Sequence, residues 1–205
     1  MASDGTVYRP TSRFFTTGGT WLFAGGWCAA AWVDAGVAGA VSALPACAGL
    51  AFGGWLAFWY PRVEVDDEAV RLVNPLRTVS VPWAALAHVS TQYAMTLVTP
   101  HGQYRAWAAP GPGAGHVARV SVSDVRAVSA GSADARGAVP MGDLPTAPSG
   151  SAALLVRRRW QRLVEEGRVE AGVADRTPVT NRWNVPAIAV LAVAAITTLI
   201  VALVG

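Results

Sequence analysis

The placement of charged residues constrains this chain more than any other feature. Between Phe14 and Tyr60 the one charged residue is Asp34, and from Trp183 to Gly205 there is none. Only 14% of the residues are charged, whereas about 25% are charged in an ordinary soluble domain. The two cysteines argue against a disulfide framework and a multi-cysteine zinc site. The pattern therefore disfavours a soluble globule and predicts a protein that is partly embedded in a membrane.

The apolar tracts have the lengths of three transmembrane helices. The ranges 14–33 and 37–60 are each long enough, at about 1.5 Å per helical residue, to cross a hydrocarbon core of roughly 30 Å. Between them Asp34-Ala35-Gly36 predicts a tight turn. We therefore expect a transmembrane hairpin over 14–60 and a third transmembrane helix over 184–205. Small residues at Gly25, Gly26, Gly49 and Gly53 favour close helix packing.

Arginine placement predicts the orientation in the membrane. Basic residues flank the apolar tracts on one side only, and these are Arg9, Arg13, Arg62, Arg71, Arg176 and Arg182. The turn at 34–36 and the C-terminus carry none. Because cytoplasmic segments are enriched in Lys and Arg, we expect a multi-pass protein of the cell membrane. Its N-terminal tail, 1–13, and the region 61–182 would be cytoplasmic, and its C-terminus would be external.

The region between the hairpin and the last helix changes character. Residues 61–109 alternate apolar and polar side chains between turn signals, which predicts about six short antiparallel strands in a small β-sandwich or open barrel. The range 110–150 is rich in Gly, Pro, Ser and Ala and predicts a flexible linker. A basic amphipathic helix is expected over 151–168, followed by a juxtamembrane segment over 169–183. The fold class is thus membrane α plus a small β-domain.

One stretch of the β-region is similar to a known family. The residues are Arg71, Asn74, Pro75, Arg77, Thr78, Val81, Pro82 and Trp83, with Trp107 in a later strand. They resemble the bacterial PH-like domain family of the actinobacterial low-molecular-weight protein antigen 6 type. The layout is similar too: a two-span hairpin, a PH-like domain, a variable linker and a final span led by Arg182-Trp183. This resemblance implies a fold more than an activity.

Arginines are the candidate contact residues for lipid or a protein partner. Arg71 and Arg77 flank the Asn74-Pro75 turn, and guanidinium groups suit phosphate oxygens. The alternative is an exposed pair that only solubilises the domain. A second cluster consists of Arg157, Arg158, Arg159 and Arg162. Its helix either lies against anionic lipid or closes the β-domain with its arginines in solvent.

No constellation in the sequence indicates catalysis. His88, His101 and His116 lack partners at metal-ligand spacing, and no nucleophile motif is present. The acidic run Asp66-Asp67-Glu68 is interpreted as a solvated turn. We therefore predict a protein that is not an enzyme and has no catalytic residue, metal or cofactor.

Two functions remain as hypotheses. The first is a membrane-anchored docking module that binds a protein partner or anionic lipid headgroups at the cytoplasmic face, without nucleic acid. The second is a non-catalytic accessory subunit of a cell-envelope or transport complex, in which the membrane spans make the specific contacts.

Overall fold

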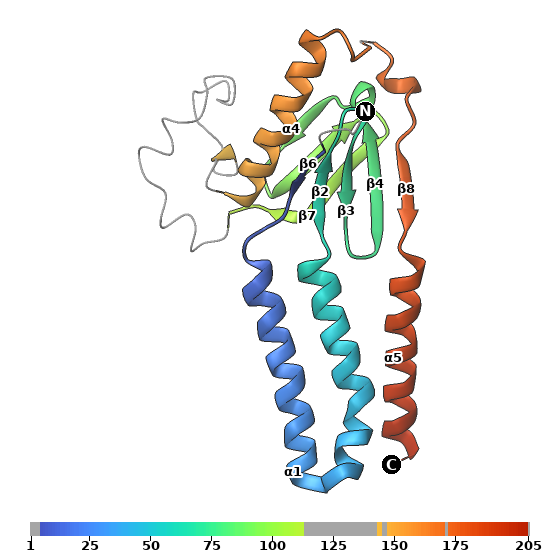
Figure 1. Cartoon of the computed structure of the whole chain (residues 1–205). Coiled ribbons are helices and arrows are strands. Elements are labelled where there is room, and N and C mark those ends of the chain that lie inside the picture. The colour runs from blue at the N-terminus through green and yellow to red at the C-terminus, as the bar shows by residue number, and fades with distance from the viewer. Residues whose placement is uncertain (1–4, 113–142, 145–146, 171, 205) are drawn as a thin grey trace. The chain divides into compact units, whose positions relative to one another are not determined.

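The computed structural model describes residues 5–112, 143–144, 147–170 and 172–204. Contacts divide the chain into a β unit, 1–10 with 62–182, and a helical unit, 11–61 with 183–205. Figure 1 shows strands in the first and long helices in the second. Each unit is described on its own below.

The first sheet of the β unit has five strands in the order β1-β2-β3-β4-β8. Its strands are β1 (Thr6–Tyr8), β2 (Arg62–Val65), β3 (Ala69–Val73), β4 (Arg77–Pro82) and β8 (Thr180–Trp183). Strands β1 to β4 pair antiparallel, with Tyr8 opposite Val63 and Arg62 opposite Val73. In β2 and β4 the apolar side chains alternate inward, which is the pattern of a sheet with one buried face.

A second, antiparallel sheet contains β5 (His88–Ser90), β6 (Ala94–Thr99) and β7 (Gly102–Pro110). The six strands expected within 61–109 are thus present. They form two sheets with separate hydrogen bonding, so the structure has the sandwich form of the prediction. The first sheet also takes a strand from each flank, β1 and β8, which the alternation within 61–109 does not reveal.

Helix α4 (Pro148–Glu165) completes the core of the β unit. Its buried face consists of Ala152, Ala153, Val156 and Leu163, which belong to the same cluster as Val63, Leu72, Val79, Met95 and Leu97 from the two sheets. The helix therefore closes the β-domain, which settles the alternative left open by the sequence. Val164, next to the buried Leu163, is 52% exposed.

The predicted linker 110–150 falls mostly on 113–142 and 145–146, which lie outside the described residues. Its described C-terminal part belongs to the packed domain. Leu144 is buried, and Gly150 lies so close to the Leu144 carbonyl oxygen that a Cβ at this position would meet it at 2.0 Å. The composition of this range is that of a linker, but small residues here also allow close packing.

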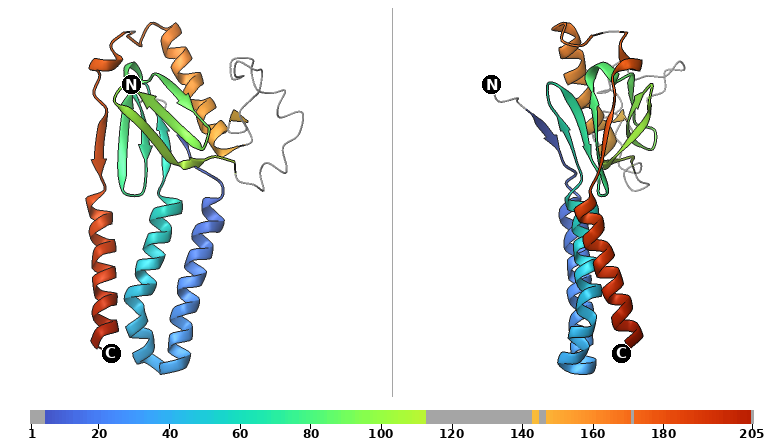
Figure 2. Two further views of the ribbon diagram at one scale, coloured as in Figure 1. Left: turned by 180° about the vertical axis from the view of Figure 1, so that it is seen from behind. Right: turned by 90° about the vertical axis from the view of Figure 1, so that its right-hand side faces the viewer.

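Helix α1 (Arg13–Gly54) continues into a π-helical turn over Trp55–Trp59 and is broken at Ala35 and Gly36, as expected for the turn there. The two halves fold back on each other, as Figure 2 shows from two sides. The indole Nε1 of Trp21 donates to the Ala51 carbonyl oxygen at 3.1 Å. A Cβ on Gly54 would meet Thr20 Cγ2 at 2.4 Å, so glycine permits this close approach.

Helix α5 (Val185–Val204) packs along the second half of α1. A Cβ on Gly49 would lie 3.0 Å from Ala194 Cβ, and one on Gly53 would lie 3.8 Å from Leu191 Cδ2. Close packing is therefore present at Gly49, although against α5 and not between 14–33 and 37–60 as expected, and the contact at Gly53 has ordinary van der Waals length. The prediction of close packing is wrong at Gly25 and Gly26, where an added Cβ would meet nothing within 4 Å.

Both helices are long and apolar enough to cross a membrane. The most apolar windows of Arg13–Trp59 and Val185–Val204 have mean hydropathies of 1.7 and 2.8. Their large apolar side chains point outward, as at Phe15, which is 83% exposed, and Val33, which is 87% exposed. Helices that are apolar all round are typical of buried or membrane-embedded segments.

Candidate functional site

The acidic turn between β2 and β3 is a structured element rather than a solvated loop. One carboxylate oxygen of Asp66 accepts hydrogen bonds from the backbone N–H groups of Glu68 and Ala69, at 3.0 and 2.7 Å. Its other oxygen pairs with Arg71 Nη2 at 3.1 Å. Both oxygens of the Asp66 carboxylate therefore have partners within the turn and β3. Arg71 lies on the exposed face of β3, and its charge is paired with Asp66.

Asp67, the next residue of that turn, binds helix α4. Its carboxylate forms ion pairs with Arg159 and with Arg168, the latter at 3.2 Å. These contacts join the acidic turn to a helix that lies about 90 residues later in the chain. Arg159 was a candidate for lipid contact, and in the structure it fastens α4 to the β-domain.

Arg157 has a similar structural role. Its Nη1 pairs with Asp143 Oδ1 at 2.8 Å, and its Nη2 donates to the Val89 carbonyl oxygen at the same distance. The Asp143 carboxylate also accepts from the Thr91 hydroxyl at 2.8 Å. Asp143 is nearly buried, with 6% of its side chain exposed, so the pair acts inside the domain.

The other two arginines of α4 point away from the core. Arg158 and Arg162 are exposed and lie four residues apart, which places them on the same face of the helix. Neither forms an ion pair with any residue in the described part of the chain. The structure thus separates the predicted basic cluster into two anchoring and two solvent-facing residues.

The turn between β3 and β4 is fixed by Asn74. Its Nδ2 donates to the Arg105 carbonyl oxygen at 3.0 Å, and its Oδ1 accepts from the backbone N–H of Trp107 at 2.8 Å. The side chain therefore bonds the hairpin of the first sheet to β7 of the second. This gives a physical reason for asparagine before Pro75.

Trp83, directly after β4, belongs to the core of the domain, and Pro82 before it is half-buried. The Trp83 side chain is 4% exposed, and its Nε1 donates to the Asp66 carbonyl oxygen at 3.0 Å. The indole thus anchors the acidic turn from below. The Pro-Trp pair is part of the scaffold and is not a contact surface.

Three exposed side chains and the half-buried Arg77 gather around the β3–β4 turn. Arg105 and Trp107 stand on the outward face of β7, since burial alternates along that strand. Leu76 and Arg77 follow Asn74-Pro75 directly. Leu76 is 43% exposed and Trp107 is 58% exposed. We call Leu76, Arg77, Arg105 and Trp107 the tip patch.

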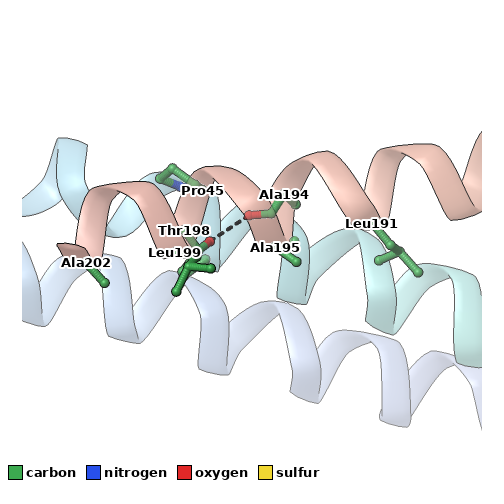
Figure 3. Close-up of a pocket in the computed structure, with 9 residues that line it drawn as sticks. Pro45, Leu191, Ala194, Ala195, Thr198, Leu199 and Ala202 are labelled. Carbon is green, nitrogen blue, oxygen red and sulfur yellow. Dashed lines mark hydrogen bonds between the residues drawn. The ribbon is translucent and has the colours of Figure 1, made fainter. Parts of the chain in front are cut away.

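An apolar groove lies between the second half of α1 and α5 (Figure 3). It has a volume of about 530 Å³, and its lining includes Pro45, Gly49, Leu191 and Ala195. The Thr198 hydroxyl at its edge donates to the Ala194 carbonyl oxygen of its own helix at 2.7 Å. The Thr198 hydroxyl is therefore already paired within its helix, and the groove is lined mainly by apolar surface. Among the residues that the structure describes, no group of three potential metal ligands occurs.

The comparison with protein families agrees with this architecture. The family model for the bacterial PH domain matches residues 60–182. The chain belongs to the bacterial PH domain family. The matched range covers β2 to β7, α4 and nearly all of β8, so the PH domain includes the helix and the strand that follow the predicted linker. No curated protein and no solved structure matches the chain.

Sequence reasoning did not select two residues of the tip patch, Leu76 and Arg105. Arg105 could have been selected from the sequence, because it stands two residues before Trp107 in a strand and therefore lies on the same face. Its position beside the β3–β4 turn was not predictable, because the hydrogen bonds of Asn74 join residues more than 30 positions apart.

Proposed function

We propose that this protein is a multi-pass membrane protein whose PH domain acts as a non-catalytic docking module at the cytoplasmic face of the cell membrane. One observation carries the proposal. The PH domain is inserted between apolar helices, and the connections to them are short: Tyr8 to Arg13, Tyr60 to Arg62, and Trp183 to Val185. A domain held in this way acts near the membrane surface.

The break at Ala35-Gly36 and the lengths of the helices support three transmembrane spans, 14–33, 37–60 and 184–205. The arginines at the domain side of each span support a cytoplasmic PH domain. Confinement to two dimensions raises the effective concentration of the domain near its ligand, so weak contacts are sufficient.

Cysteine accessibility tests this topology. Cys28 and Cys47 are replaced by Ala, and a single cysteine is introduced as Asp34→Cys or Glu68→Cys. In intact cells a membrane-impermeant maleimide should label the cysteine at 34 and leave the one at 68 unlabelled until the cells are permeabilised. Labelling at 68 in intact cells would refute the cytoplasmic placement of the domain.

The groove between α1 and α5 favours a second candidate, an accessory subunit of a cell-envelope or transport complex. In a bilayer, small residues such as Gly49 and Ala195 allow another helix to approach closely. Exchange of 14–60 for an unrelated helical hairpin distinguishes the two candidates. Partners that remain bound after the exchange support docking by the PH domain, and partners that are lost support the accessory subunit.

A further inference from the structure

The arginines of the tip patch, like Arg158 and Arg162 on α4, differ from most other arginines of the PH domain in having no described carboxylate as a partner. Arg71, Arg157, Arg159 and Arg168 are all paired with carboxylates. Within the described ranges, neither Arg77 nor Arg105 has a carboxylate within ion-pair distance. The patch therefore presents two positive charges that no acidic side chain described here neutralises.

The patch also combines these charges with exposed apolar side chains. Leu76 lies at the turn and Trp107 on the adjacent strand, and both are substantially exposed. Tryptophan is enriched at the membrane–water interface because its ring is apolar and its N–H is polar. Arginine binds phosphate oxygens with a planar pair of donors. The apolar side chains suit the interfacial region of a bilayer, and the arginines suit its phosphate groups.

The connections to the apolar helices leave the first sheet at the end that carries the patch. Val73, the last residue before the turn, pairs with Arg62, the first residue of β2. Tyr8, at the end of β1, pairs with Val63, and β8 runs toward the same end of the sheet (Figure 1). All three connections to the helices therefore leave the sheet at the end that carries the β3–β4 turn. At about 3.5 Å per residue, the link from Tyr60 to Arg62 is shorter than about 10 Å.

The turn is held rigidly enough to form a defined surface. The two hydrogen bonds from Asn74 fix the hairpin against β7 from both sides of Ala106. Leu76, Arg77 and Trp107 are thus presented together, and ordering them on binding costs little entropy.

We propose that the tip patch binds the anionic phosphate headgroups of the leaflet that the protein's own helices enter. Leu76 and Trp107 would enter the interfacial layer, and Arg77 and Arg105 would contact the phosphates. This inference rests on the proposed function, because it requires the helices to span a membrane. It favours lipid over a protein partner, since four side chains fall well short of the roughly 800 Å² per partner of a standard protein interface.

Spin labelling of the full-length protein tests the proposal. The chain with Cys28→Ala and Cys47→Ala is reconstituted into nanodiscs of phosphatidylcholine alone or of phosphatidylcholine with one quarter phosphatidylglycerol. An apolar nitroxide is attached through Leu76→Cys or through Glu68→Cys. Glu68 is exposed and lies at the opposite end of β3, so it serves as the matched control position.

The expected result is protection at position 76 only. With anionic lipid, that label should become shielded from a water-soluble nickel chelate and accessible to oxygen, and the label at 68 should stay accessible to the chelate. One basic residue near an anionic leaflet changes the docked-to-undocked ratio by a factor of about five. The double substitution Arg77→Ala and Arg105→Ala should therefore lower this ratio about 25-fold.

A charge-matched variant controls for net charge. Arg158→Ala with Arg162→Ala removes two exposed arginines outside the patch and should leave the protection at 76 unchanged. A label at 76 that is equally accessible to the chelate in both lipid mixtures overturns the proposal. If it is then shielded only in native membrane vesicles, the docking function stands with a protein as the ligand. The cysteine topology experiment reports separately on whether the helices span the membrane.

Discussion

Asn74 and Trp107 are joined by a 2.8 Å hydrogen bond from the Trp107 backbone N–H to the Asn74 side-chain oxygen. Since the same side chain donates to Arg105, one residue of the first sheet satisfies two backbone groups of the second. This link lies beside the edge of the hydrophobic core, because Ala106, between the two bonded residues of β7, belongs to the core cluster. The Asn74 side chain therefore has a role beyond turn formation, because it also holds the β3–β4 turn against β7.

Asn74→Ala should destabilise the PH domain by about 2 kcal/mol, since two hydrogen bonds are lost at about 1 kcal/mol each. Thermal unfolding of the full-length protein in detergent measures the effect. Asn74→Asp keeps the acceptor for the Trp107 N–H and loses the donor to the Arg105 carbonyl oxygen. The loss of unfolding free energy should therefore be smaller than for Asn74→Ala. Backbone hydrogen exchange near residue 105 should become faster. Equal stability of Asn74→Ala and the wild type would contradict the role of this link.

The pair Asp143–Arg157 should contribute to stability in spite of its charges. Asp143→Ala leaves a guanidinium without its partner and should cost about 2–3 kcal/mol, as expected for hydrogen bonds to charged groups. In a double-mutant cycle with Arg157→Ala, the coupling energy should be about 1–2 kcal/mol. Arg158→Ala is the matched control, and its effect should stay within about 0.5 kcal/mol. Strict additivity of the two substitutions would show that the pair contributes nothing.

Gly36 should be required for the break in α1. Its φ of 63° and ψ of −147° fall in a region that is essentially restricted to glycine. Gly36→Ala should therefore destabilise the hairpin by about 1–3 kcal/mol, measured as loss of helical content on titration with dodecyl sulfate. Gly25→Ala, at a helical position with open space around it, should be neutral or stabilising. Equal effects of the two substitutions would argue against a strained turn at 36.

Tyr8 should make stability depend on pH in the alkaline range. Burial raises the pKa of the Tyr8 phenol above its ordinary value of 10.0. The unfolded chain therefore loses this proton first, and the free energy of unfolding should fall as the pH rises above about 10. Below that pH both states are protonated and Tyr8 adds no pH dependence. Tyr8→Phe should remove this component, and denaturant unfolding between pH 9 and 11 measures it. An unchanged slope in the variant would refute the assignment.

The strands within 61–109 could be predicted because each one alternates between core and solvent. Strands β1 and β8 could not, because β1 has three residues, β8 has four, and neither alternates between fully buried and exposed side chains. They are strands only because β2 and β4 offer hydrogen-bonding edges, and such pairing is invisible in local sequence. The break at Gly36 was predictable from the single charged residue and glycine between two apolar tracts.

The arginines of α4 show where sequence reasoning about a site ends. Arg157 and Arg158 are neighbours of the same type, yet one is bound by Asp143 and the other is exposed. Their partners come from distant segments, so helical spacing alone could not separate anchors from free charges. Trp107 was selected through a family resemblance. Its position near the β3–β4 turn depends on Asn74, whose hydrogen bonds cross from one sheet to the other.

The turn between β5 and β6 holds two segments that lie about 30 residues apart in the sequence. The Tyr93 carbonyl oxygen accepts from the Gly111 N–H at 2.9 Å, and the Thr91 hydroxyl donates to Asp143. Gly111 and Asp143 are therefore bound by residues that lie two positions apart in this turn. Chain between two fixed points tolerates insertions, since doubling its length adds only about 0.6 kcal/mol of loop-closure free energy. Residues can thus be added to the sequence between Gly111 and Asp143, or a reporter inserted there, at a low cost in loop-closure entropy.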